Sequence, residues 1–129
     1  MGSFSFGTFM QEGGWGMWPV MLLGIAGLAG AGRYVVRPER TWLRFAAALW
    51  LALVVVVIHA VVIDVAAVFR FLESPSGGVP DAQVARVLMT GLKESSRPAA
   101  LGGIFLALIP LLVAAGIYRE GVVRPAAAS

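Results

Sequence analysis

The chain contains no cysteine, and charged side chains are scarce. Without cysteine there can be no disulfide framework, thiol nucleophile or thiolate metal ligand. Only 13% of the 129 residues are charged, about half the share of a soluble domain, whereas 59% are hydrophobic. This imbalance predicts that lipid rather than water surrounds most of the folded surface.

Patterns for soluble enzyme chemistry are also missing. His59 is the single histidine and has no cysteine or glutamate close to it, so we expect no metal site. The sequence shows no nucleophile–base triad, no phosphate-binding glycine loop and no paired carboxylates. The net charge of +3 lies mostly beside apolar runs, which points to membrane topology rather than to a nucleic-acid surface. We therefore expect no enzymatic activity, no cofactor, no metal and no nucleic-acid partner.

Three apolar stretches are long enough to cross a bilayer, whose core takes about 20 helical residues. They predict transmembrane helices over about residues 15–36, 41–72 and 82–118. The second, about 48 Å long, exceeds a bilayer core of about 30 Å, so it must tilt or protrude. The third should be kinked near Pro98. The sequence thus predicts an all-α integral membrane protein, with residues 1–129 forming one membrane domain.

Arginine predicts the orientation of this domain. Four arginines flank the first connection, against Glu39: Arg33, Arg37, Arg40 and Arg44. Charges around the second connection balance, so the positive-inside rule places the N-terminus outside and the C-terminus inside the cell. This predicts an outer turn at residues 73–81 and a cytoplasmic tail at 119–129. We expect residues 1–14 either to lie on the membrane surface as an amphipathic segment or to fray.

Small and aromatic residues indicate how the helices pack and where the membrane ends. Glycine and alanine four residues apart let helices approach closely in lipid, and we favour contacts within the chain over contacts between copies. The packing candidates are Ala26, Gly27, Gly30, Ala31, Gly102, Gly103 and Ala107. The expected interfacial anchors are Trp15, Trp18, Trp42 and Tyr118.

Ionisable residues in or beside the spans are the candidates for function. His59 and Asp64 are five residues apart, about 140° around a helix, so they do not share a face. Glu94 has Arg97 three residues further on, within reach of an ion pair. Two interpretations stay open: a hydrogen-bonded His59 with a water-exposed Asp64, or a proton pathway that uses Glu94, Asp64 and His59.

The order of these features resembles the MotA/TolQ/ExbB proton-channel family. The opening FMQEGGWGMWPVMLLGIAGLAGAGRY, with its Gly13–Gly14 pair, Pro19 and basic helix end, is similar to the start of such chains. The third helix adds the family-like residues Gly91, Leu92, Lys93, Glu94, Gly102, Ile109 and Pro110. The family's large cytoplasmic insert is missing, and Ala99 stands where the third-helix threonine is expected. The chain therefore resembles a short, divergent member.

This resemblance implies a multi-pass subunit of the bacterial inner membrane, surrounded by membrane lipid. By resemblance it would form a homopentamer around a single-span ExbD/TolR-like partner and couple the proton gradient to ion or protein transport. The alternative is a non-conducting structural or assembly protein with three membrane helices. It is favoured by the missing insert and by the absence of the family's threonines, of which the second-helix one belongs to a Gly-Thr-Val step that is replaced here by LVVVVIHAVVID. A third possibility is an accessory subunit of a membrane enzyme, or a lipid-binding protein, marked only by the arginines of residues 33–44.

Overall fold

Helices make up the architecture of this chain in the computed structural model, which describes residues 5–12, 14–74 and 80–127. The elements are α1 (Phe6–Glu12), α2 (Met17–Val36), α3 (Arg40–Glu73), α4 (Asp81–Ser95) and α5 (Arg97–Ala127). Three runs are long and apolar enough to cross a membrane: α2, α3 and the α4–α5 column over Asp81–Val122. The predicted all-helical fold with three helices able to span a membrane is confirmed, and no strand occurs in the described ranges.

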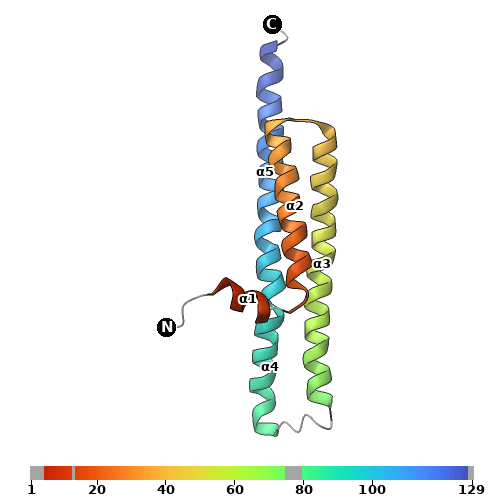
Figure 1. Cartoon of the computed structure of the whole chain (residues 1–129), viewed down its shortest axis with the longest axis vertical. Coiled ribbons are helices and arrows are strands. Elements are labelled where there is room, and N and C mark those ends of the chain that lie inside the picture. The colour runs from red at the N-terminus through yellow and green to blue at the C-terminus, as the bar shows by residue number, and fades with distance from the viewer. Residues whose placement is uncertain (1–4, 13, 75–79, 128–129) are drawn as a thin grey trace.

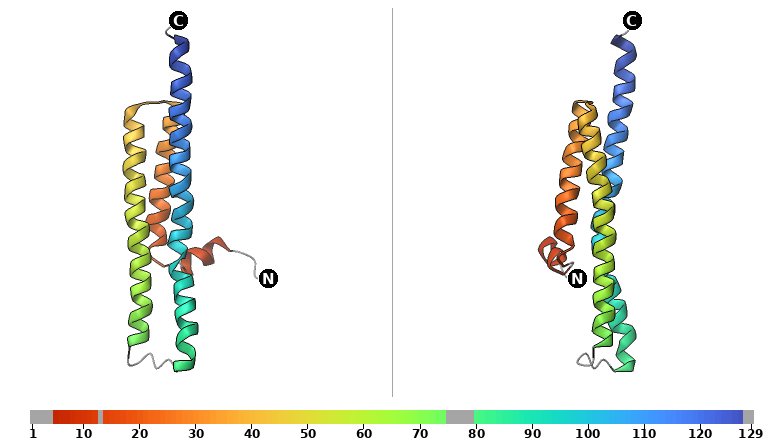
Figure 2. Two further views of the ribbon diagram at one scale, coloured as in Figure 1. Left: turned by 180° about the vertical axis from the view of Figure 1, so that it is seen from behind. Right: turned by 90° about the vertical axis from the view of Figure 1, so that its right-hand side faces the viewer.

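The helices form a long, narrow bundle of uneven thickness. Helices α4 and α5 follow one another as a single column, and α3 runs beside this column in the opposite direction (Figure 1). Helix α2 packs against α5 and α3 along part of their length, and α4 packs against α3. Helix α1 lies across the bundle near the junction of α4 and α5, as Figure 2 shows from two further sides. The bundle is thus three helices thick where α2 packs and two helices thick along α4, and α5 alone extends past the connection between α2 and α3.

The third predicted span is divided at Ser96, two residues before the proline that predicted its kink. Pro98 is fully buried and lies in the first turn of α5, where its missing N–H needs no partner. The Ser95 and Ser96 hydroxyls donate hydrogen bonds to the carbonyl oxygens of Gly91 and Lys93, at 2.8 and 2.7 Å. Hydroxyls that bond the backbone in this way compete with the regular helical pattern.

Helix α5 continues to Ala127, past the predicted end at residue 118, so the predicted tail is helical through residue 127. Contacts with the end of α2 support this extension. The Tyr34 hydroxyl donates to Oε2 of Glu120 at 3.2 Å, and Nη1 of Arg119 donates to the carbonyl oxygen of Val35 at 3.1 Å. The bond from Arg119 supplies a donor to the Val35 carbonyl, one of the last four carbonyls of α2. These carbonyls have no hydrogen-bond donor within their own helix.

The small residues predicted to pack between helices fall into two groups, one buried between helices and one exposed. In α2, Gly27, Gly30 and Ala31 are buried and Ala26 is half-buried. Gly102 is buried so closely against Val57 that a Cβ there would overlap a valine methyl. Gly103 and Ala107 are exposed on the outer face of α5, and a Cβ at Gly103 would meet no atom within 4 Å. The i, i+4 spacing alone could not show which small residues face a neighbouring helix and which face outward.

Helix α2 has the length and the end residues expected of a single membrane crossing. Its 20 residues are about 30 Å long, the thickness of a bilayer core. Trp15 and Trp18 are exposed around its start, 90% and 60% respectively, where indole rings suit the interface. At the other end the Arg33 guanidinium lies over the Trp42 ring, 5.5 Å from its centroid. We therefore expect these positions to mark the two faces of a membrane slab along α2.

Helix α3 extends beyond this slab. A Cβ on Gly16 would lie 2.7 Å from the Cβ of Ala60, so the start of α2 is level with Ala60. The rest of α3, residues 61–73, adds about 20 Å of helix past that level. The long second helix predicted from the sequence therefore protrudes past α2 together with α4. The predicted outer turn joins these two helices, and its residues 75–79 lie outside the described residues.

Candidate functional site

A groove opens between α3 and α4, at the end of the bundle where α2 no longer covers them. Its volume is about 620 Å³. The polar lining comprises Asp64, Gln83, Arg86, Thr90, Glu94 and Ser95. The apolar wall comprises Ala67, Val68, Phe71 and Val87, and the glycines Gly14 and Gly91 also line the groove. We call these residues the acidic groove.

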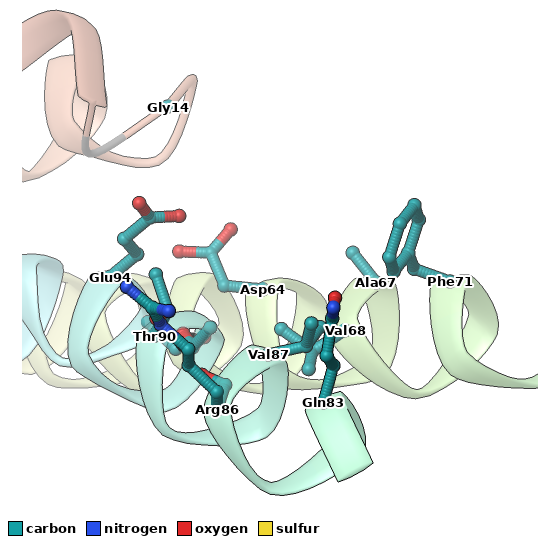
Figure 3. A pocket seen from close by; sticks show the side chains of 12 residues that line it. Gly14, Asp64, Ala67, Val68, Phe71, Gln83, Arg86, Val87, Thr90 and Glu94 are labelled. Atoms are coloured by element: carbon teal, nitrogen blue, oxygen red, sulfur yellow. Dashed lines mark hydrogen bonds between the residues drawn. The ribbon is translucent and has the colours of Figure 1, made fainter. Parts of the chain in front are cut away.

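Asp64 and Glu94 both line the acidic groove, although they belong to different helices. Asp64 comes from α3 and is half-buried, and Glu94 comes from α4 and is exposed. Figure 3 shows both carboxylates projecting toward the same open side, with Gly14 beyond them. Asp64 lies four residues past Ala60, about 6 Å beyond the start of α2. Both carboxylates therefore sit near the edge of the slab, where water offsets the cost of ionisable groups in lipid.

Two glycines shape this groove. At Gly91, a Cβ would lie 2.5 Å from a Val68 methyl group, so α4 approaches α3 there more closely than any side chain would allow. Gly14 has a φ of +70°, a left-handed conformation that glycine adopts without steric cost. That turn carries the chain from α1 into α2 beside the two carboxylates.

Arg86 is the functional candidate that the sequence interpretation missed. It is exposed, and it lies on one stripe of α4 with Thr90 and Glu94, at spacings of four residues. The Thr90 hydroxyl donates to the Arg86 carbonyl oxygen at 3.0 Å. The acidic groove thus holds two carboxylates and one guanidinium. The i, i+4, i+8 spacing of these residues was a signal that could have identified Arg86.

The other sequence candidates lie elsewhere. His59 is exposed on α3 and does not line the acidic groove, as its angular separation from Asp64 predicts. Arg97, expected to reach Glu94, is half-buried at the start of α5 and does not line the groove either. The structure therefore brings together two of the three proton-pathway candidates, Asp64 and Glu94.

Between the acidic groove and the arginine-rich end, the core of one copy is apolar. Its buried cluster includes Val20, Leu53, Val57, Phe105 and Ile109. Ser95, at the groove, is the one buried polar side chain among the described residues. Within the same ranges no three His, Cys, Asp or Glu side chains gather where they could hold a metal ion. No protein-family model, curated protein or solved structure matches this chain.

Proposed function

We propose that the chain is a subunit of a proton-using, energy-transducing complex of the bacterial inner membrane, with Asp64 and Glu94 as its proton-exchanging site. The observation that carries this proposal is the presence of both carboxylates in one groove at the edge of the membrane slab. Gly14 and Glu94, two residues on which the resemblance to the MotA/TolQ/ExbB family rests, also line this groove. Residues far apart in the sequence thus contribute to one site.

The chemistry of the acidic groove suits proton exchange. Asp64 and Glu94 supply two carboxylates to one open groove, and carboxyl groups can take up and release protons. Arg86 lines the same groove and offsets part of their negative charge. Because the groove is open and its carboxylates are at most half-buried, protons can enter from water. In the proposed orientation the groove faces the outside of the cell, and the arginine-rich end faces the cytoplasm.

A proton path through the membrane needs a second chain, because the core of one copy is apolar. Past the level of Ala60, α3 presents on one face apolar side chains that are more than half exposed: Val62, Ile63 and Phe69. Exposed apolar patches of this kind are typical of protein interfaces. We propose that other copies, arranged as a pentamer, and a single-span partner cover this face and complete the path.

Proton flux into liposomes tests the proposal. The protein is reconstituted alone and with the single-span protein encoded beside it, and uptake is followed with an enclosed pH-sensitive dye. The double variant Asp64→Asn, Glu94→Gln should abolish flux, whereas the variant Glu73→Gln, Asp81→Asn should retain it. The control acids belong to the same two helices but do not line the groove. Absence of wild-type flux under both conditions, or flux unaffected by the first variant, would reject the proposal.

The second candidate function is a non-conducting assembly protein that keeps the three-helix shape. The apolar core favours it, since Ser95 is the one buried polar side chain in the described residues. The mass of the purified protein in detergent separates the two candidates. A pentamer supports the proton-using subunit, and a monomer or dimer supports the assembly protein.

A further inference from the structure

A second groove lies at the arginine-rich end of the bundle, along the seam between α3 and α5. Its volume is about 380 Å³. The wall from α3 includes Leu43, Ala47, Trp50 and Leu51, and the wall from α5 includes Pro110 and Val113. No residue of α2 lines it, so it opens on a face that α2 does not cover. We call these residues the Trp50 groove.

The Trp50 indole N–H and the Leu106 carbonyl oxygen beside the Trp50 groove are paired with each other. Pro110 has no N–H, so it cannot bond the carbonyl oxygen of Leu106 one turn earlier. Instead Nε1 of Trp50 donates to that oxygen at 2.9 Å. The indole ring therefore presents only carbon to the groove, and the small side chain of Ala47 leaves space beside it. A groove of this kind accepts an apolar ligand.

The mouth of the Trp50 groove is positively charged. Arg40 and Arg44 are exposed and lie on one stripe of α3 with Ala47 and Leu51, at positions i, i+4, i+7 and i+11. On α5, Glu120 accepts a hydrogen bond from Tyr34 of α2, away from this stripe. The basic side chains therefore stand at the interface end of an apolar groove.

We propose that the Trp50 groove binds an anionic phospholipid, with one acyl chain in the groove and the phosphate held by Arg40 and Arg44. From Leu43 to Leu51 the groove extends about 12 Å into the membrane, starting between the levels of Arg40 and Arg44. A two-fold pair of copies fits this face poorly. About an axis along the membrane normal, such a contact would bring Arg40 and Arg44 of both copies together at the same depth.

Fluorescence of a protein with Trp50 as its single tryptophan tests the site. Trp15, Trp18 and Trp42 are replaced by Phe, and the protein is reconstituted with a small fraction of brominated-chain phosphatidylglycerol or phosphatidylcholine. The phosphatidylglycerol should quench Trp50 more strongly. The basic residues near an anionic surface contribute about 1 kcal/mol each, so Arg40→Gln and Arg44→Gln should each lower the lipid preference by about fivefold. Arg70→Gln, at the other end of α3, is the matched control and should leave the preference unchanged.

Three further measurements distinguish a lipid from other occupants. Ala47→Leu should fill the groove and weaken quenching by both lipids. Excess inorganic phosphate should leave the quenching intact, and displacement by phosphate would mean a free-anion site. Native mass spectrometry of the protein with all four tryptophans should show retained phosphatidylglycerol that is lost in Arg40→Gln, Arg44→Gln. Equal quenching by the two lipids would overturn the proposal, as would a lipid preference that survives both arginine substitutions. A cross-linked dimer in which Trp50 is shielded from lipid would also overturn it.

Discussion

Nε1 of Trp50 on α3 donates a hydrogen bond of 2.9 Å to the carbonyl oxygen of Leu106 on α5. Pro110 follows that carbonyl by four residues and has no N–H with which to bond it. An unpaired carbonyl is unfavourable in hydrocarbon. The hydrogen bond from the Trp50 indole on α3 therefore takes the place of the bond that Pro110 cannot make within α5. Trp50 and Pro110 should therefore contribute to stability as a unit.

A double-mutant cycle checks this relationship. Trp50→Phe should lower the free energy of unfolding by about 1 kcal/mol, because hydrogen bonds between membrane helices are worth about 0.6–2 kcal/mol. Pro110→Ala restores the backbone donor within α5, so the same tryptophan substitution should then cost clearly less. Unfolding by SDS in mixed micelles measures all four proteins. Equal costs of Trp50→Phe with and without Pro110 would show that the two residues are independent.

Adjacent glycines on α5 provide a test of helix packing. Gly102→Ala should destabilise the bundle by about 1–3 kcal/mol, because its new methyl group must displace Val57 in a packed core. The methyl group added by Gly103→Ala would lie in open space. Because alanine has a higher helix propensity than glycine, this variant should stabilise α5 by up to about 1 kcal/mol. The same unfolding assay compares the two variants. Similar effects at both positions would contradict the packing of α5 against α3.

The three apolar helices were predictable because each long apolar run needs its own helix in lipid, and Pro38 separates the first two. The length of α5 was not predictable, because it depends on contacts such as the hydrogen bond between Tyr34 and Glu120. These two residues are far apart in the chain. Spacing also could not show that Gly102 faces Val57 while Gly103 faces outward. That difference is set by how α5 is rotated against its neighbours.

Single residues of the candidate site could be predicted from the sequence, but their arrangement in one groove could not. Asp64 and Glu94 were identified one by one because ionisable residues beside membrane spans are rare. Their meeting depends on the register of α3 against α4 and on α2 starting level with Ala60, so that both carboxylates remain uncovered. Neither the register nor this level can be worked out from residue spacing within one helix.

Single cysteines can test the orientation cleanly, since the chain has none of its own. Asp81→Cys places a thiol at the start of α4, and Glu39→Cys places one in the connection between α2 and α3. A membrane-impermeant maleimide added to intact cells should label the thiol at position 81 and leave position 39 unlabelled. Both should react once the membrane is opened. The reverse pattern in intact cells would invert the topology and turn the acidic groove toward the cytoplasm.

The central claim is that Asp64 and Glu94 act as one proton-exchanging site. The most direct test compares proton flux in liposomes for Asp64→Asn, Glu94→Gln and the double variant. Groups that act as a unit give strongly non-additive effects. We predict that each single substitution reduces flux nearly as much as the pair. Losses that multiply, or a single substitution that leaves flux at the wild-type rate, would contradict a shared site.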